Sequence, residues 1–159
     1  MLKKILIATG DSPEAAEIFQ SGLTLAEKYG AQISILHVLN LAQTGFEVMG
    51  SPLMGGTYPM MNDVAIQQYQ QELQDHEQRG LERLKFYAAQ ATAKNIEVEI
   101  LQNIGDAGRT ICETAKNAAV DLIVMGRNQK SLLSELFLGS TSNYVLHHAA
   151  CSVMVIQHQ

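Results

Sequence analysis

Two segments in the last third of the chain carry the residue types best suited to chemistry. Gly126 and Arg127 follow the apolar run 121–125, and glycine at that point permits a sharp exit from a buried strand. Further along, Gly139 and Ser140 open a helix-like segment that offers free backbone amides and a hydroxyl. A strand exit and a helix start brought together can surround a phosphate group, so the sequence predicts an anion site.

The same region also supplies the charge that such a site needs. Arg127 and Lys130 are its available cations, and Gly139, Ser140 and Thr141 would present amides to the ligand. Charge-assisted hydrogen bonds of this kind contribute about 1.5 to 3 kcal/mol each when sheltered from water. A micromolar site, which corresponds to about 8 kcal/mol, is therefore within reach.

Composition narrows the classes of partner. The chain has 159 residues and a formal charge of -5, which predicts one domain with one core and argues against nucleic acid as a partner. Cys112 and Cys151 are too few for a disulfide framework. No apolar run approaches the roughly 20 residues that cross a bilayer, and no secretory signal is apparent. We therefore expect a cytoplasmic protein without membrane insertion.

Short apolar runs alternate with helix-like segments along the chain. The five runs are 5–8, 33–39, 96–101, 122–125 and 153–156. Most are apolar on successive residues, as in parallel strands buried on both faces, whereas 96–101 alternates with glutamates and should lie at a sheet edge. The pattern predicts an α/β fold in which helices cover both faces of a doubly wound, five-stranded parallel sheet.

Capping residues mark the expected helices. Ser12 and Gly30 would bound the first helix, Asp106 would cap a later one, and the last would run over about 139–148. After Asn62 a long Gln/Glu-rich helix is expected, with an apolar inward stripe and a polar, solvated first half. Residues 41–61, which precede this long helix, are expected to form a Gly/Met/Pro-rich loop. Such a loop is a lid, a surface that docks a protein partner, or a disordered segment.

The order of these segments resembles the universal stress protein family, in particular its nucleotide-binding branch, over nearly the whole chain. The matching segments are 4–8 with 12–15, 36–38, 121–126, 138–146 and 151–156. The resemblance implies a single domain over 1–159, with 41–61 as an insertion and strand order 3-2-1-4-5. In that order the first and fourth strands meet where connections leave to opposite faces, and open α/β sheets bind ligands at this reversal.

The family's phosphate motif is glycine, two residues, glycine, nine residues, glycine, then serine or threonine. Gly126, Gly139 and Ser140 match it, but Gln129 replaces the middle glycine. This change either retunes the site, because the glutamine amide can donate a hydrogen bond, or weakens it, because the backbone there loses the conformational freedom of glycine.

A second departure lies after the first strand, where Gly10 takes the place of the family's aspartate and Asp11 follows. Adenine recognition then rests on the backbone of residues 8–11 and Val38, or the loop shifts by one residue and Asp11 takes the role. The nucleotide-binding residues implied by the resemblance are Ala8, Thr9, Gly10, Asp11, Val38, Met125, Gly126, Arg127, Asn128, Gln129, Gly139, Ser140 and Thr141.

Several other polar residues have simpler interpretations. Adjacent histidines on a helix point about 100 degrees apart, so His147 and His148 with Cys151 do not predict a metal site. His37, inside a strand, is interpreted as a hydrogen-bonded core histidine. The last strand, 151–157, would be an open sheet edge unless it pairs with a twofold mate, and the family resemblance implies the same homodimer.

The leading functional hypothesis is a cytoplasmic homodimer that binds ATP or another adenine nucleotide, with or without magnesium, and regulates a stress response. One alternative is a nucleotide-independent interaction module that docks a protein partner through 41–61. The other is a slow ATP hydrolase. No catalytic residue is assigned, because no carboxylate or histidine is placed beside the phosphate loop by the sequence.

Overall fold

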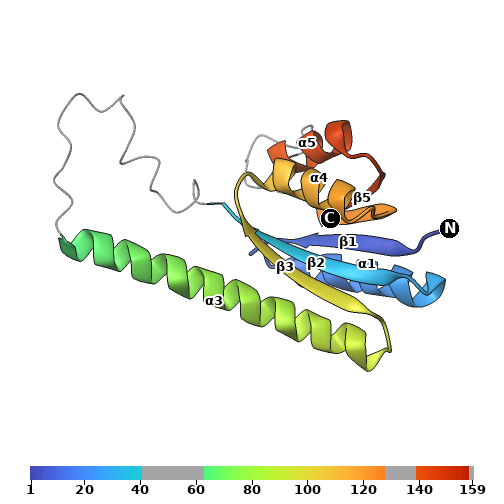
Figure 1. Cartoon of the computed structure of the whole chain (residues 1–159), viewed down its shortest axis with the longest axis horizontal. Helices are drawn as coiled ribbons and strands as arrows, with labels where there is room; N and C mark the ends of the chain where they lie inside the picture. The colour runs from blue at the N-terminus through green and yellow to red at the C-terminus, as the bar shows by residue number, and fades with distance from the viewer. Residues whose placement is uncertain (41–62, 128–138, 158–159) are drawn as a thin grey trace.

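The computed structural model describes residues 1–40, 63–127 and 139–157, and they form a sheet of five parallel strands (Figure 1). The strands are β1 (Lys4–Thr9), β2 (Gln32–Leu39), β3 (Val98–Ile104), β4 (Leu122–Gly126) and β5 (Ser152–Ile156). Their order is β3-β2-β1-β4-β5, and every neighbouring pair is parallel. The predicted topology is confirmed, and the alternating run lies at an edge as β3.

Helices cover both faces of this sheet. They are α1 (Ala15–Tyr29), α3 (Asp63–Ala93), α4 (Ala107–Asn117) and α5 (Ser140–His148). On one face, Phe19 of α1 and Leu84 of α3 lie in one buried cluster with Ile7 of β1. On the other face, Ile111 of α4 and Val145 of α5 lie in a second buried cluster. Successive strand residues therefore enter different cores, which explains the continuous apolar runs of the sequence.

The helix ends follow the predicted caps in two of three cases. Asp106 Oδ1 accepts a hydrogen bond from the Arg109 amide at 2.9 Å, and Gly30 ends α1 with φ of 66°. The Ser12 cap was predicted wrongly. Helix α1 begins at Ala15, whose amide donates to the Ser12 carbonyl at 3.1 Å. The backbone turn through Pro13 closes the first turn without a side-chain cap.

Helix α3 holds to the sheet mainly through its C-terminal half. Leu84, Tyr87 and Ala91 are buried there, and the rings of Tyr87 and Phe19 stack with centroids 4.4 Å apart. At Gly80 the helix backbone comes so close to the sheet that a Cβ would lie 2.5 Å from polar side-chain atoms of β2 and β3. The N-terminal half extends past the sheet (Figure 1).

Several predictions fall on residues outside the described ranges. They concern the loop 41–61, the Asn62 cap, and residues Asn128, Gln129 and Lys130 of the phosphate loop. Among the helices that are described, none combines the length and apolar character needed to cross a membrane.

Candidate functional site

A cavity of about 950 Å³ opens at the carboxyl ends of β1 and β4. These strands are neighbours, with Ala8 opposite Met125, and the sheet order reverses between them. This is where open α/β sheets hold their ligands. Helix α3 supplies a further wall with Tyr69, Glu72, Leu73, His76 and Arg79.

Most of the predicted nucleotide-binding residues border this cavity. They are Ala8, Thr9, Gly10, Asp11, Val38, Met125, Gly126, Arg127 and Thr141. Gly139 and Ser140 are not among the bordering residues, and Asn128 and Gln129 lie outside the described ranges. Segments from both ends of the chain therefore meet around one space.

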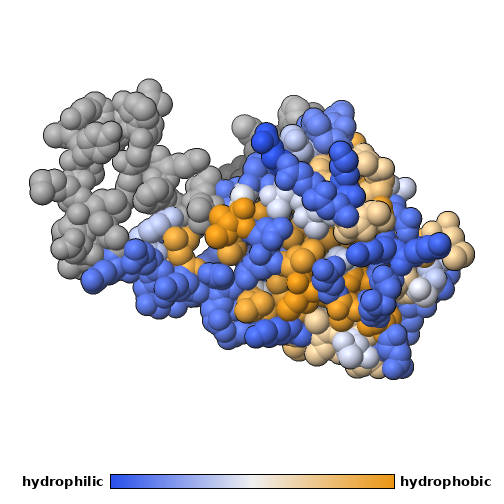
Figure 2. Space-filling model, viewed as in Figure 1, coloured by the Kyte–Doolittle hydropathy of each residue, from blue (hydrophilic) through white to orange (hydrophobic). Residues whose placement is uncertain are grey.

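A second, smaller cavity of about 450 Å³ lies under the N-terminal half of α3. Leu39, Leu73 and Ile104 contribute its apolar lining, and Ile104 is 61% exposed. In the space-filling view, apolar residues gather between the hydrophilic start of α3 and the rest of the domain (Figure 2). The two cavities share Asn40, Leu73 and His76, so the wall between them is thin.

Gly126 is required by packing rather than by backbone conformation. It is absent from the described glycines with positive φ, which are Gly30 and Gly105. A Cβ at residue 126 would clash with the Ile18 side chain of α1. The glycine thus lets α1 approach the end of β4, and this close packing sets the shape of the cavity floor.

The start of α5 brings a threonine to the cavity. Gly139 stands at the N-cap position with φ of -56° and ψ of 155°, and its carbonyl accepts a hydrogen bond from Ser142 Oγ at 3.0 Å. Ser140 is exposed, whereas Thr141 borders the cavity. The hydroxyl of the family motif therefore has a neighbour, Thr141, that is better placed toward this space.

Thr9 ends β1 with an unsatisfied hydroxyl. The residue is only 5% exposed, and its Oγ1 has no hydrogen-bond partner within residues 1–40, 63–127 and 139–157. A buried hydroxyl without a partner costs free energy. Because Thr9 borders the cavity, a polar ligand bound there could satisfy this group.

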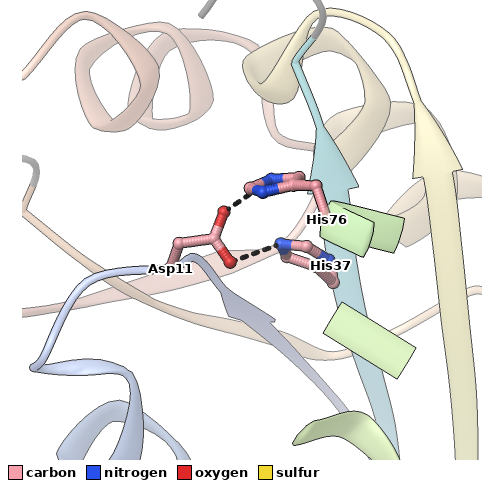
Figure 3. A group of neighbouring side chains, drawn as sticks. All are labelled: Asp11, His37 and His76. Carbon is pink, nitrogen blue, oxygen red and sulfur yellow. Dashed lines mark ion pairs between the residues drawn. The ribbon is translucent and has the colours of Figure 1, made fainter. Parts of the chain in front are cut away.

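Asp11 is held by partners from two other elements (Figure 3). Its Oδ1 lies 3.3 Å from His37 Nε2 and also contacts Arg83 Nη2, while its Oδ2 lies 3.0 Å from His76 Nε2. The contact with the His37 imidazole, followed by the effect of Arg83, holds the pKa of the Asp11 carboxyl well below its usual range. Asp11 is therefore ionised at neutral pH.

His37 is the buried member of this group, with 1% exposure. Gln102 of β3 places its amide nitrogen 3.2 Å from His37 Nδ1 and donates to the Glu77 carbonyl at 3.0 Å. The interpretation of His37 as a hydrogen-bonded core histidine agrees with this contact. Its opposite ring nitrogen, however, faces Asp11, so the ring joins the core to the edge of the cavity.

Sequence reasoning missed the contribution of α3 to the site. The first half of this helix was predicted to be a solvated polar face, yet His76 in that half contacts Asp11. Arg83, in the second half of the helix, also contacts Asp11. A signal was present, because His76 lies three residues after Leu73 and eight before Leu84. Polar residues in line with an apolar stripe face the same neighbour as the stripe.

Comparison with known proteins agrees with this architecture. The sequence model of the Universal stress protein family matches residues 1–157. Universal stress protein Sll1388 of Synechocystis is 30% identical over 159 residues, covering 98% of this chain and 97% of that protein. Universal stress protein YxiE of Bacillus subtilis is 31% identical over 157 residues, covering 99% and 100%.

Solved structures share the fold at lower identity. Hypothetical protein MJ0577 aligns with a TM-score of 0.78 at 19% identity, covering 100% of this chain and 98% of its own. A universal stress protein in complex with cAMP gives 0.64 at 14%, covering 99% and 98%. A family protein of Arabidopsis thaliana with AMP bound gives 0.61 at 20%, covering 99% and 92%. The family match over 1–157 and the relatives at 30% and 31% identity show that the chain belongs to the universal stress protein family.

Proposed function

We propose that this chain binds an adenine nucleotide in the cavity between β1, β4 and α3, and that it acts as a cytoplasmic regulator in the response to stress. One observation carries the proposal. The end of β1, the exit of β4 and the start of α5 all border the same cavity, through Thr9, Gly126 and Thr141. A nucleotide needs such a space, with an apolar part for the base and donors for the phosphates.

The cavity offers both parts. Leu36, Val38 and Met125 border it as apolar side chains suited to a purine ring, and Arg127 and Arg79 border it as cations. Its volume of about 950 Å³ falls within the range of small-molecule sites, roughly 300 to 1,000 Å³. The arrangement has the chemistry that an AMP-sized or ATP-sized ligand requires.

The phosphates would lie toward Arg127 and the first turn of α5. Backbone amides at a helix start favour an anion, and Thr141 adds a hydroxyl on the cavity side. We propose that Gly139 and Ser140 contribute to phosphate binding, together with Asn128 and Gln129, which lie outside the described ranges. Magnesium, where the ligand is ATP, would be carried by the phosphates.

The nucleoside would lie toward the loop after β1. Asp11 is engaged by His37, His76 and Arg83, so the backbone groups of residues 8–11 and Val38 are the better candidates for the base. Thr9 Oγ1, the buried hydroxyl that lacks a partner among the described residues, would bond to the ligand. The AMP-bound and cAMP-bound family structures support this choice of ligand class.

We further propose that the protein is a homodimer joined through β5. This strand is an edge of the described sheet, and Met154 on it is 40% exposed. Open edges promote association, and antiparallel pairing with a twofold mate would close this one. Light scattering at micromolar concentration should give twice the chain mass, and a monomeric mass would refute the dimer.

Nucleotide binding is tested by thermal unfolding of nucleotide-stripped protein. The panel is ATP with magnesium, ADP, AMP and cyclic AMP, each at about one hundred times a micromolar dissociation constant. A ligand that binds the folded state should then add about 2.7 kcal/mol and raise Tm by about 5 to 10 °C. No shift with any of the four would refute the proposal.

A matched pair of variants locates the binding. Thr9→Val removes the hydroxyl that borders the cavity and keeps the side-chain volume. It should reduce the rise in Tm that the nucleotide causes. Thr92→Val removes an exposed hydroxyl that bonds within α3, at 2.9 Å to the Ala88 carbonyl, and should leave the shift unchanged. Equal shifts in both variants would place the ligand elsewhere.

A further inference from the structure

Asp11, His37 and His76 bring three potential metal-ligating groups together from distant parts of the chain (Figure 3). Asp11 lies in the loop after β1, His37 in β2 and His76 in α3. One ligand atom from each lies within 4.8 Å of the others. The sequence separations make this convergence a property of the tertiary fold.

The spacing of the atoms is close to that around a tetrahedral ion. Zinc lies about 2.0 to 2.2 Å from nitrogen and oxygen ligands, so two ligand atoms of one tetrahedron stand about 3.3 Å apart by simple geometry. Asp11 Oδ1 lies 3.3 Å from His37 Nε2, and Asp11 Oδ2 lies 3.0 Å from His76 Nε2. One ligand atom from each residue lies within 4.8 Å of the others. Small side-chain movements would therefore complete a coordination shell.

A buried polar atom points to the same place. His37 Nε2 is buried, and its contact with Asp11 Oδ1 at 3.3 Å lacks good hydrogen-bond geometry. A buried ring nitrogen without a well-formed hydrogen bond is costly. A metal ion between the three side chains would satisfy it.

From these contacts we propose that Asp11, His37 and His76 bind a divalent transition-metal ion, with zinc as the best chemical fit. Two imidazoles and one carboxylate suit zinc and its first-row neighbours, whereas magnesium and calcium favour all-oxygen sites. Asp11 and His76 border the cavity, so water from it can supply the remaining ligand. The proposal stands independently of nucleotide binding.

Gln102 contacts the ring nitrogen of His37 that would not bind the metal. Its amide nitrogen donates to the Glu77 carbonyl and lies 3.2 Å from His37 Nδ1. If this nitrogen also donates to Nδ1, the ring proton is on Nε2. Metal binding through Nε2 moves that proton to Nδ1, and the amide turns so that its oxygen accepts it. Such partners fix the tautomer of ligating histidines.

Arg83 competes with the ion for the carboxylate. Its guanidinium contacts Asp11 Oδ1 and is partly exposed, at 28% of the side chain. Arginine and metal ion cannot both hold this oxygen closely, because their charges repel. The guanidinium balances the charge of Asp11 and would move outward when a metal binds.

The untagged, metal-stripped chain of 159 residues is titrated with zinc chloride in competition with a chromophoric chelator. One ion per chain is expected. His76→Gln should weaken zinc binding by more than about 100-fold, since losing even an outer partner costs 10- to 100-fold. His147→Gln changes an exposed histidine of α5 and should stay within about twofold.

Arg83→Gln separates a metal site from a simple ion-pair cluster. Removing one positive charge close to a divalent ion should raise zinc affinity roughly tenfold. Cobalt should give the visible absorption of a four-coordinate site with nitrogen and oxygen ligands. The proposal is overturned by absence of stoichiometric zinc binding, by binding insensitive to His76→Gln, or by cobalt-thiolate bands that indicate Cys112 or Cys151.

Discussion

The two ends of the main cavity are built in different ways. The end near Gly126 and Thr141 comes from a strand exit and a helix start in the last third of the chain. The end near Asp11 joins β1, β2 and α3 through long-range polar contacts. The first end is thus a local backbone arrangement, and the second depends on how α3 lies against the sheet.

The largest expected effect tests the dependence of the second end on α3. Gly80→Val would place side-chain atoms against His37 and Gln102, because even a Cβ would lie 2.5 Å from them. Overpacking costs typically 1 to 3 kcal/mol, and we expect about 3 kcal/mol here in urea denaturation. Gly10→Ala is the control, since its Cβ meets nothing within 4 Å. An equal loss in both variants would mean that Gly80 packing is unimportant.

The next prediction separates the two ends by their ligands. Arg127→Gln should weaken AMP binding about 10- to 100-fold, because it removes a charged donor worth about 1.5 to 3 kcal/mol, and should leave zinc affinity unchanged. His76→Gln should weaken zinc binding and leave AMP affinity unchanged. Calorimetry with each ligand measures both. If either variant weakened both ligands equally, the division into two ends would be wrong.

The two ends of the cavity could be predicted from the sequence to different degrees. The glycine spacing indicated Gly126 and Gly139, because a strand exit and a helix start are local features. The resemblance to the family supplied the strand order. The contacts of Asp11 with His76 and Arg83 depend on where the long helix α3 packs against the sheet. They were not predicted, because a polar helix face that contacts another element has the same sequence pattern as one that faces solvent. The predicted Ser12 cap failed because a backbone turn replaced it.

A smaller effect is expected where α4 meets α5. A Cβ at Gly108 would lie 2.8 Å from the Tyr144 ring, and that ring stacks on His148 at 4.0 Å between centroids. Gly108→Ala should cost about 1 kcal/mol, since overpacking is partly offset by the better helix propensity of alanine. Because α5 carries Thr141, AMP affinity should fall slightly and zinc affinity should stay unchanged. Urea denaturation and calorimetry check the two parts, and a stabilised variant would contradict the packing argument.

The smallest effect lies at the opposite end of the strands from the cavity. Asp121 Oδ2 accepts hydrogen bonds from the Lys3 and Lys4 amides, at 2.7 and 2.9 Å, and these bonds lower the pKa of its carboxyl. Because the carboxyl pKa is lower in the folded state, the ionised group stabilises the fold at pH values above its unfolded pKa of about 3.9. That stability is lost as pH falls through the folded-state pKa.

Asp121→Asn should therefore lower Tm slightly at neutral pH, with the difference from the unmodified chain shrinking below about pH 4. Neither AMP nor zinc binding should change, because Asp121 is not among the residues that border the cavity. Calorimetric scans from acid to neutral pH measure the difference, and a difference that grew in acid would reverse the assigned sign.

The central claim is that one nucleotide spans the cavity from the loop after β1 to the start of α5. Amide chemical-shift mapping of isotope-labelled, nucleotide-stripped protein with AMP tests it most directly. The account predicts that amides of Thr9, Gly10, Gly126 and Thr141 shift together on one binding curve, while those of β5 stay in place. Unchanged amides at all four positions, or shifts confined to another surface, would contradict it.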